Sequence, residues 1–246
     1  MLLYPIGTTN ACADACTYLS TQGYSFTDHP CPEITHLMLD VPSFLPDGLL
    51  RDKSSIEPIL SMVPQNVTLI GGNLTVCSLD SYRKLDLLKD PQYLAKNAAI
   101  TADCAVRLCS KDLERTFPDS PALVIGWGRI GKCLAGKLRA LGCPVSIAAR
   151  KEADRALAQA LGYDALPIEA IPQRIDTWHL IFNTVPSPLP AFHIPQTCHA
   201  YELASTPGLP EGQYVRAKGL PGIMAPYSSG MLIAQTIIRL FKEEKS

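Results

Sequence analysis

Several features that would assign the chain to a broad class of proteins are missing from its sequence. No apolar run approaches the ~18 residues that a membrane-spanning helix needs, and the opening residues form too short an apolar run for a secretory signal. The 22 Lys and Arg residues are balanced by 23 Asp and Glu, for a net charge of -1. No basic stretch is present to attract nucleic acid or an anionic membrane. We therefore expect a cytoplasmic protein with a small-molecule ligand and with no nucleic-acid or membrane partner.

Paired cysteine motifs are also missing. The nine cysteines are scattered, and no two stand in a C-x-x-C arrangement, so we expect reduced thiols that mostly fill core positions. His193, Cys198 and His199 match no common metal-ligand spacing and lie in a proline-rich segment, which favours surface histidines over a metal site. The sequence thus predicts no metal ion.

A chain of 246 residues is long for one domain and comfortable for two, because domains cluster around ~100–150 residues. The N-terminal part alternates short apolar runs with helical patterns, which is typical of a parallel sheet with crossover helices. In this part we expect strands at residues 2–7, 36–42 and 66–72, and helices at 10–19 and 54–63. These elements predict a small α/β domain.

The same alternation repeats more regularly from Pro121 onward. Expected strands cover residues 122–126, 144–149, 178–186, 201–205 and 214–222, and expected helices cover 90–113, 130–141, 152–161 and 228–242. We expect an α/β protein with a substrate domain at 1–92, a linking helix at 93–116, a nucleotide-binding domain at 117–226 and a C-terminal helix at 227–246 that packs back between the domains.

Glycines at a strand-to-helix turn form a G-x-G-x-x-G motif. Gly126 makes the tight turn, Gly128 lets the backbone approach a pyrophosphate, and Gly131 lets the helix lie close to the strand. Arg129 and Ile130 complete the loop, and the helix N-terminus offers free N–H groups to phosphates. Because a strand precedes the motif and a helix follows it, the motif predicts a dinucleotide site. The alternative is a tight turn that binds nothing.

The end of the next strand indicates which dinucleotide is bound. An NAD site normally places Asp or Glu there, whereas this chain has Ala149, Arg150 and Lys151. A guanidinium pairs with the 2′-phosphate of NADP, and a carboxylate would repel it. We therefore expect NADP(H) in preference to NAD(H). The alternative is that both charges are simply solvated at a strand end.

The nicotinamide end of the cofactor should lie near two later loops. Polar groups and exposed backbone in the first loop suit the ribose and carboxamide, and glycines in the second permit close approach of the ring. The residues concerned are Asn183, Thr184, Val185, Pro186, Gly219 and Gly222. The alternative is that proline and glycine merely end strands here.

Strand ends in the first domain are candidates for the substrate site, because parallel sheets bind ligands beyond the carboxyl ends of their strands. Small or hydroxylated residues there could hold a carboxylated molecule through N–H and O–H groups. They are Gly7, Thr8, Thr9, Ser43, Gly72 and Asn73. Ordinary turn chemistry explains them equally well.

Catalytic candidates come from the start of the expected linking helix, where Asn97, Thr101 and Asp103 are spaced so that at least two share a face. Asp103 is the only acid there that could transfer a proton. An acid that interacts with the helix dipole is an equally good interpretation of Asp103.

The segments VIGWGRIGKCLAGKLRALGCPVSIAARK, IFNTVPSPL, ELASTPG and AKGLPGIMAPYSSGMLIAQTI resemble the family of dipicolinate synthase A subunits, and NAAITADCAVRL does so more weakly. The resemblance implies a flavodoxin-like N-terminal domain and a C-terminal Rossmann domain with a doubly wound parallel sheet, related in fold to D-2-hydroxyacid dehydrogenases. It also implies an NADP-linked oxidoreduction and a separate flavoprotein-like B subunit. The N-terminal half departs from the family pattern, which indicates a shortened or divergent member.

Three functions remain open from the sequence. The first is an NADP-dependent oxidoreductase that acts on a small carboxylated substrate, similar to the dipicolinate synthase A subunits. The second is a non-catalytic NAD(P)-binding subunit or redox sensor, which would keep Gly126, Gly128 and Gly131 without needing a proton donor. The third is an enzyme like the D-2-hydroxyacid dehydrogenases. Assembly into a homo-oligomer is left open.

Overall fold

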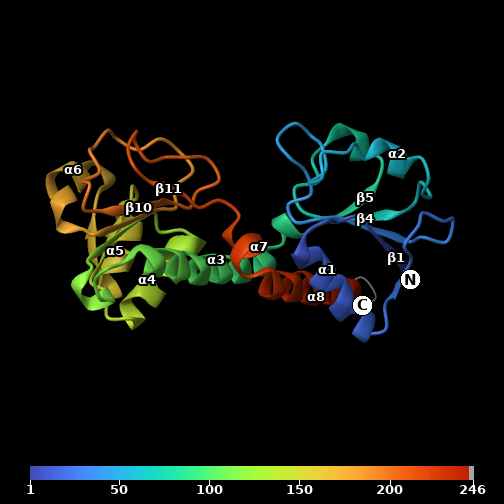
Figure 1. Cartoon of the computed structure of the whole chain (residues 1–246), viewed down its shortest axis with the longest axis horizontal. Helices are drawn as coiled ribbons and strands as arrows, with labels where there is room; N and C mark the ends of the chain where they lie inside the picture. Colours follow the sequence, from blue (N-terminus) through green and yellow to red (C-terminus); the bar gives the residue numbers. More distant parts are fainter. Residues whose placement is uncertain (244–246) are drawn as a thin grey trace. The chain divides into compact units, whose positions relative to one another are not determined.

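The chain folds into two compact α/β units (Figure 1), seen here in a computed structural model that describes residues 1–243. One unit contains Met1–Asn97 together with Pro221–Ser246, and the other contains Ala98–Leu220. We call them unit 1 and unit 2. Each unit is built around one parallel sheet, which confirms the predicted α/β class with two domains.

Unit 1 contains a parallel sheet with the strand order β2-β1-β3-β4-β5. This order is that of flavodoxin-like folds, so this part of the fold prediction is confirmed. The strands are β1 (Leu2–Pro5), β2 (Ser25–Phe26), β3 (His36–Met38), β4 (Thr68–Gly71) and β5 (Arg83–Asp86). The centre of the sheet, β3 and β4, is buried, and its polar side chains are those of His36 and Thr68.

Two helices of unit 1 pack tightly on each other, α1 (Asn10–Thr21) and α8 (Pro226–Glu243), and they lie side by side in Figure 1. Thr9 caps α1 by accepting a hydrogen bond from the amide of Cys12. At the crossing, a Cβ on Gly230 would stand 2.6 Å from the carbonyl oxygen of Ala11. The close approach of the helices therefore requires a glycine at this position.

Unit 2 contains a six-stranded parallel sheet with the order β11-β10-β9-β6-β7-β8. In chain order within the unit this is 3-2-1-4-5-6 read from the β8 edge, the dinucleotide-binding arrangement, in which the order reverses between β6 and β9. The strands are β6 (Ala122–Ile125), β7 (Val145–Ala148), β8 (Asp164–Leu166), β9 (Leu180–Asn183), β10 (His199–Glu202) and β11 (Val215–Arg216). The Rossmann prediction is confirmed.

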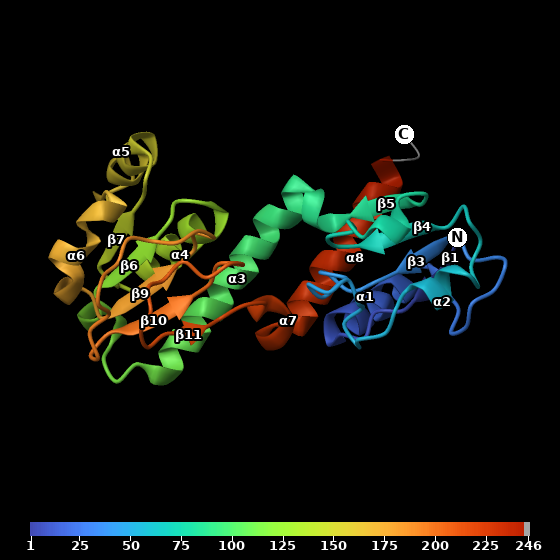
Figure 2. The ribbon, with the colours of Figure 1, turned by 90° about the horizontal axis from the view of Figure 1, so that it is seen from above.

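Helices cover this sheet and leave its central strands fully buried. Helix α4 (Arg129–Ala140) packs along β6 and β7, and α5 (Glu152–Ala160) packs along β7 and β8 (Figure 2). A short helix, α6 (Ile171–Arg174), lies beyond β8. The residues of β6 and of β9 are all buried, as their continuous apolar sequences predict.

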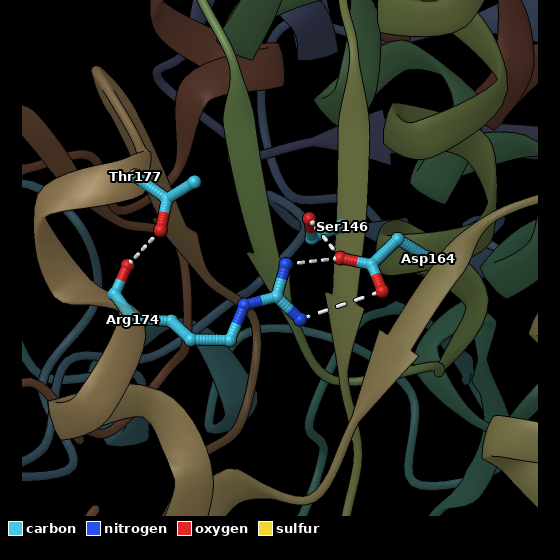
Figure 3. Close-up of polar contacts among 4 residues, drawn as sticks. All are labelled: Ser146, Asp164, Arg174 and Thr177. Atoms are coloured by element: carbon cyan, nitrogen blue, oxygen red, sulfur yellow. Dashed lines mark hydrogen bonds and ion pairs between the residues drawn. The ribbon is translucent and has the colours of Figure 1, made fainter.

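Polar contacts fix the edge strand β8 (Figure 3). Arg174 of α6 pairs with Asp164 through Nη2 and Oδ2 at 2.6 Å, and the hydroxyl of Ser146 donates to the same carboxylate at 2.9 Å. The guanidinium of Arg174 holds the pKa of Asp164 below its usual value. These contacts connect β7, β8 and α6, and they give a structural role to a cluster that contains a serine, an acid and a base.

The remaining helices differ from the sequence expectation. Helix α3 (Pro91–Asp112) has nearly the expected bounds, and the division between the units falls within it, after Asn97. Helix α2 (Glu57–Leu60) is one turn where ten residues were expected, and Pro58 lies in its first turn. Helix α7 (Leu220–Met224) occupies residues that were expected to end a strand.

Four short strands also differ from the expectation. Strands β2, β5 and β8 were missed, and β11 covers two residues of an expected nine. All four lie at or beside a sheet edge, where pairing with one neighbour needs little apolar sequence. Among the described residues, no helix is long and apolar enough to span a membrane.

Candidate functional site

The glycine motif forms the turn between β6 and α4. Gly126 has φ +101°, in the left-handed region that favours glycine. A Cβ on Gly131 would collide with the carbonyl oxygen of Gly126, so the helix can lie this close to the strand only without a side chain there. Gly128 is the N-cap of α4, and apart from its neighbours along the chain no described atom lies within 4 Å of where its Cβ would be. The backbone at Gly128 is therefore open to a ligand, as the motif predicts.

The loop after β9 packs directly on this turn. A Cβ on Gly126 would stand 2.5 Å from the hydroxyl of Thr184 and 2.9 Å from a methyl group of Val185. The Thr184 hydroxyl donates to the carbonyl of Ile125 at 2.8 Å. The two strand ends that meet at the reversal of strand order are thus joined, and the ligand-binding crevice of such sheets lies there.

A cavity of about 260 Å³ opens at these strand ends. It is lined by the glycine turn, by the end of β7 with the start of α5, by one residue after β8 and by the loop after β9. The lining residues are Gly126, Trp127, Gly128, Ala149, Arg150, Lys151, Asp154, Ile168, Thr184, Val185 and Pro186. Sequence reasoning placed eight of these at a cofactor site, and the structure brings those eight together.

The cavity has a basic rim. Arg150 and Lys151 are exposed and follow β7 directly. The guanidinium of Arg155 donates through Nη1 to the carbonyls of Ala149 and Arg150, at 2.9 and 2.7 Å. Because Arg155 engages both carbonyls, it fixes the backbone from which the Arg150 side chain projects.

Part of the lining of the cavity is apolar and includes Ile168, Val185 and Pro186. An apolar wall suits the flat face of an adenine, and the α4 N-terminus suits a pyrophosphate. The residues present therefore fit a dinucleotide, with its phosphates at Gly128 and its adenosine end toward Arg150.

Sequence reasoning missed four residues at this site. Trp127 could have been found, because it stands between the first two glycines; its indole nitrogen is buried and has no acceptor among the described residues. Ile168, Asp154 and Arg155 gave no signal. They reach the site through the folding of β8 and α5, which no local spacing reports.

Asn183 has a supporting role. It is fully buried and does not line the cavity. Its amide nitrogen donates to both carboxylate oxygens of Glu202 at 2.9 Å, and its oxygen accepts from the amide of Val185. Glu202 also accepts from the amides of Gly208 and Leu209. The buried pair Asn183–Glu202 therefore fixes the loop that carries Thr184, Val185 and Pro186.

Other cofactor candidates lie outside the cavity. Arg129 and Ile130 are in the first turn of α4, where their amides point toward the N-terminus of the helix. Gly219 has φ +70°, and Gly222 lies within α7. The expectation that Gly222 belongs to a strand-end loop is wrong, because the last strand ends at Arg216 and a helix follows.

The three catalytic candidates lie in the middle of α3 and not at its start. Asn97 and Thr101 are four residues apart and share one face, and Thr101 is buried. Asp103 is exposed and forms an ion pair with Lys137 of α4 at 2.6 Å. Asp103 is two positions after Thr101, which places them about 200° apart around the helix. The structure thus separates Asp103 from the other two.

The donors expected to hold a substrate in unit 1 have partners within the protein. Asp40, which is 4% exposed, accepts from the amides of Thr8 and Thr9 at 2.9 and 3.1 Å and from both hydroxyls. Asp40 was not among the predicted site residues, although it lies near the end of the expected strand at 36–42. The carboxylate of Asp40 takes the position at the α1 N-terminus where a bound anion would otherwise lie.

The other strand ends of unit 1 are occupied in the same way. The Ser43 hydroxyl donates to the carbonyl of Asp40 and accepts from the amide of Gly72. The amide of Asn73 donates to Asp86 at 2.9 Å, and a Cβ on Gly7 would stand 2.8 Å from Asp40. A carboxylated ligand could use these donors only by displacing their present acceptors.

The cysteine thiols that the structure describes are free. Burial raises the pKa of Cys143 to about 11 and that of Cys109 and Cys198 to about 12. These thiols stay protonated at neutral pH and behave as small core residues. No group of His, Cys, Asp and Glu in the described part of the chain could hold a metal ion.

The chain is similar in sequence and in fold to known proteins. No family model matches the sequence. The A subunit of dipicolinate synthase from Bacillus subtilis (strain 168) is 25% identical over 238 residues, which cover 87% of this chain and 80% of that protein. The predicted resemblance to this family is confirmed by the sequence match, which extends well beyond the segments that first indicated it.

Solved structures share the fold. The crystal structure of the dipicolinate synthase A subunit from Bacillus halodurans matches 98% of this chain and 97% of its own, with a TM-score of 0.83 and 19% identity. An L-alanine dehydrogenase matches 98% of this chain and 80% of its own, with a TM-score of 0.67 and 12% identity. These matches show that the fold is shared with both proteins.

Proposed function

We propose that the chain is a divergent relative of the dipicolinate synthase A subunits that binds NADP(H) and acts as an oxidoreductase on a small carboxylated substrate. The observation that carries the proposal is the cavity beside the glycine turn. It combines an open backbone at Gly128, an apolar wall and a rim that carries Arg150 and Lys151. A single strand-end carboxylate, typical of NAD sites, is replaced by two cations at this rim.

Each part of the site has a defined task. The amides of the first turn of α4 bind the pyrophosphate, helped by the partial positive charge of the helix N-terminus. Arg150 and Lys151 bind the 2′-phosphate, and Arg155 holds the backbone from which they project. The Asn183–Glu202 pair holds the loop that closes the cavity. The bound nicotinamide would supply the hydride chemistry.

Titration of NADPH and NADH tests the cofactor assignment, and the fluorescence of Trp127, which lines the cavity, gives a signal. We expect NADPH to bind about 5- to 150-fold more tightly, since a charge-assisted phosphate contact contributes about 1–3 kcal/mol. Arg150→Gln should weaken NADPH binding and leave NADH binding unchanged.

The matched control is Arg216→Gln, which removes the same charge from an exposed strand residue outside the cavity. It should bind both cofactors like the parent. Equal affinities of the parent for NADPH and NADH, or an unaltered preference in Arg150→Gln, would contradict NADP(H) selectivity.

A second function, a non-catalytic NAD(P)-binding subunit, is favoured by one observation. Asp103, the predicted proton donor, is paired with Lys137 on an exposed helix face. If this pair is only structural, Asp103→Asn will leave any turnover of NADPH with small carboxylated acids unchanged. A chain that binds NADPH tightly but turns over no such acid, alone or with a flavoprotein-like subunit, would support the second function over the first.

A further inference from the structure

A second cavity of unit 2, also of about 260 Å³, lies at the opposite end of the sheet from the glycine turn. His179 directly precedes β9, and His199 is the first residue of β10. The amide of His199 donates to the carbonyl of His179 at 2.9 Å. Thr184, at the other end of β9, is five residues from His179, which is roughly 16 Å along a strand. The second cavity is therefore separate from the cofactor cavity.

Hydrogen-bond donors dominate the lining of this cavity. Arg115 contributes a guanidinium, Gln196 an amide, Thr197 a hydroxyl and His199 a ring nitrogen. Glu114 is the one carboxylate among the lining residues. Within the described part of the chain, no cluster suits a metal ion. The lining therefore favours a ligand that accepts hydrogen bonds.

The tautomer of His179 follows from its neighbour. Nη1 of Arg115 lies 3.1 Å from Nε2 of His179. A guanidinium has donors only, so Nε2 must accept and the proton of the neutral ring must be on Nδ1. Nδ1 is buried and has no acceptor among the described residues. Because Nδ1 has almost no exposed surface, a ligand in the cavity does not reach it, and the role of His179 is to hold the Arg115 guanidinium in place through Nε2.

We propose that this cavity binds a small oxyanion, a phosphate or a carboxylate, with Arg115 as its charged donor and with His179 as the residue that orients the Arg115 guanidinium. The guanidinium supplies the charge, and Thr197 and Gln196 supply neutral donors at the opening. Glu114 accepts a hydrogen bond from a ligand that carries a hydroxyl, such as the P–OH of hydrogen phosphate. This site is independent of the cofactor site, and its failure would leave the proposed function untouched.

Calorimetric titration of the full chain with inorganic phosphate, and separately with acetate, at constant ionic strength tests the proposal. We expect saturable binding of at least one probe, and a chemical-shift change of the His179 ring in NMR spectra. Tighter binding of phosphate would identify a tetrahedral anion, and tighter binding of acetate a carboxylate. Arg115→Gln and His179→Gln should each weaken binding by about tenfold or more.

The control variant Arg216→Gln removes an equal charge elsewhere in unit 2 and should bind the probe like the parent. NADPH titration of Arg115→Gln and His179→Gln, which should match the parent, shows that both variants fold. Binding that does not saturate, or that is unchanged in both variants, would overturn the proposal.

Discussion

His36 is a buried titratable residue whose environment makes the stability of unit 1 depend on pH. It is 9% exposed, its ring packs edge-on against Phe241 at 4.9 Å, and Nδ1 contacts the Thr35 hydroxyl at 2.8 Å. Burial, followed by the positive charges of the N-terminus and Arg83, lowers the pKa of His36 to about 4 from its usual 6.5. The folded chain therefore resists protonation where the unfolded chain accepts it.

We predict that unit 1 loses stability as the pH falls from 6.5 to 4, because the unfolded state then binds the additional proton. The loss should level off below pH 4 and amount to roughly 1–3 kcal/mol. Urea unfolding at several pH values measures it. His36→Gln should lose this component, whereas the exposed control His29→Gln should keep it. A parent-like pH dependence in His36→Gln would contradict the assignment.

Two glycines of the turn have different roles: Gly131 is needed for folding and Gly128 for binding the cofactor. A Cβ on Gly131 meets backbone, whereas a Cβ on Gly128 meets open space. We predict that Gly131→Ala destabilises the protein by about 1–3 kcal/mol and that Gly128→Ala changes stability by less than about 0.5 kcal/mol. Gly128→Ala should still weaken NADPH binding, since its methyl group faces the ligand. Denaturant unfolding and cofactor titration of both variants check this, and equal stabilities would contradict it.

Some residues of the cofactor site could be predicted from the sequence, and others could not. Gly126, Gly128, Gly131, Arg150 and Lys151 could be predicted because strand, turn and helix lie next to each other in the chain. Arg155 and the Asn183–Glu202 pair could not, because their contacts depend on backbone turns and on the pairing of β9 with β10. The role of Asp40 could not be predicted either, because the sequence does not show that its carboxylate folds back on the α1 N-terminus.

At the scale of elements, the packing of α1 on α8 depends on Gly230, where a Cβ would stand within 2.6–3.0 Å of α1 atoms, two of them backbone. We predict that Gly230→Ala destabilises unit 1 by about 1–3 kcal/mol, because backbone atoms cannot yield. Gly136→Ala in α4 is the matched control, since its Cβ meets open space. It should be neutral or add about 0.5–1 kcal/mol of stability. Thermal unfolding measures both, and an unaffected Gly230→Ala variant would contradict the packing argument.

The length of a helix or strand explains whether it could be predicted from the sequence. The long helices α1, α4 and α8 repeat apolar residues over several turns, and the central strands are continuous apolar runs. Strand β5, in contrast, reads Arg-Lys-Leu-Asp and is half-exposed. An edge strand with so little apolar sequence is fixed by its pairing with β4, which a local pattern does not report.

At the scale of the molecule, the central claim is that an NADP(H) site in unit 2 gives this chain its function. The α/β class could be predicted from the alternation of strands and helices, whereas the two sheet orders were implied by the resemblance to the dipicolinate synthase A subunits. The substrate could not be predicted, because the predicted donors of unit 1 are occupied by Asp40, Ser43 and Asp86.

A crystal structure of the chain with NADPH tests this claim most directly. The account predicts the pyrophosphate against the open backbone of Gly128, the adenine on the apolar wall at Ile168 and Val185, and the 2′-phosphate within hydrogen-bonding distance of the Arg150 guanidinium. Density for the cofactor elsewhere, or a 2′-phosphate directed away from Arg150 and Lys151, would contradict it.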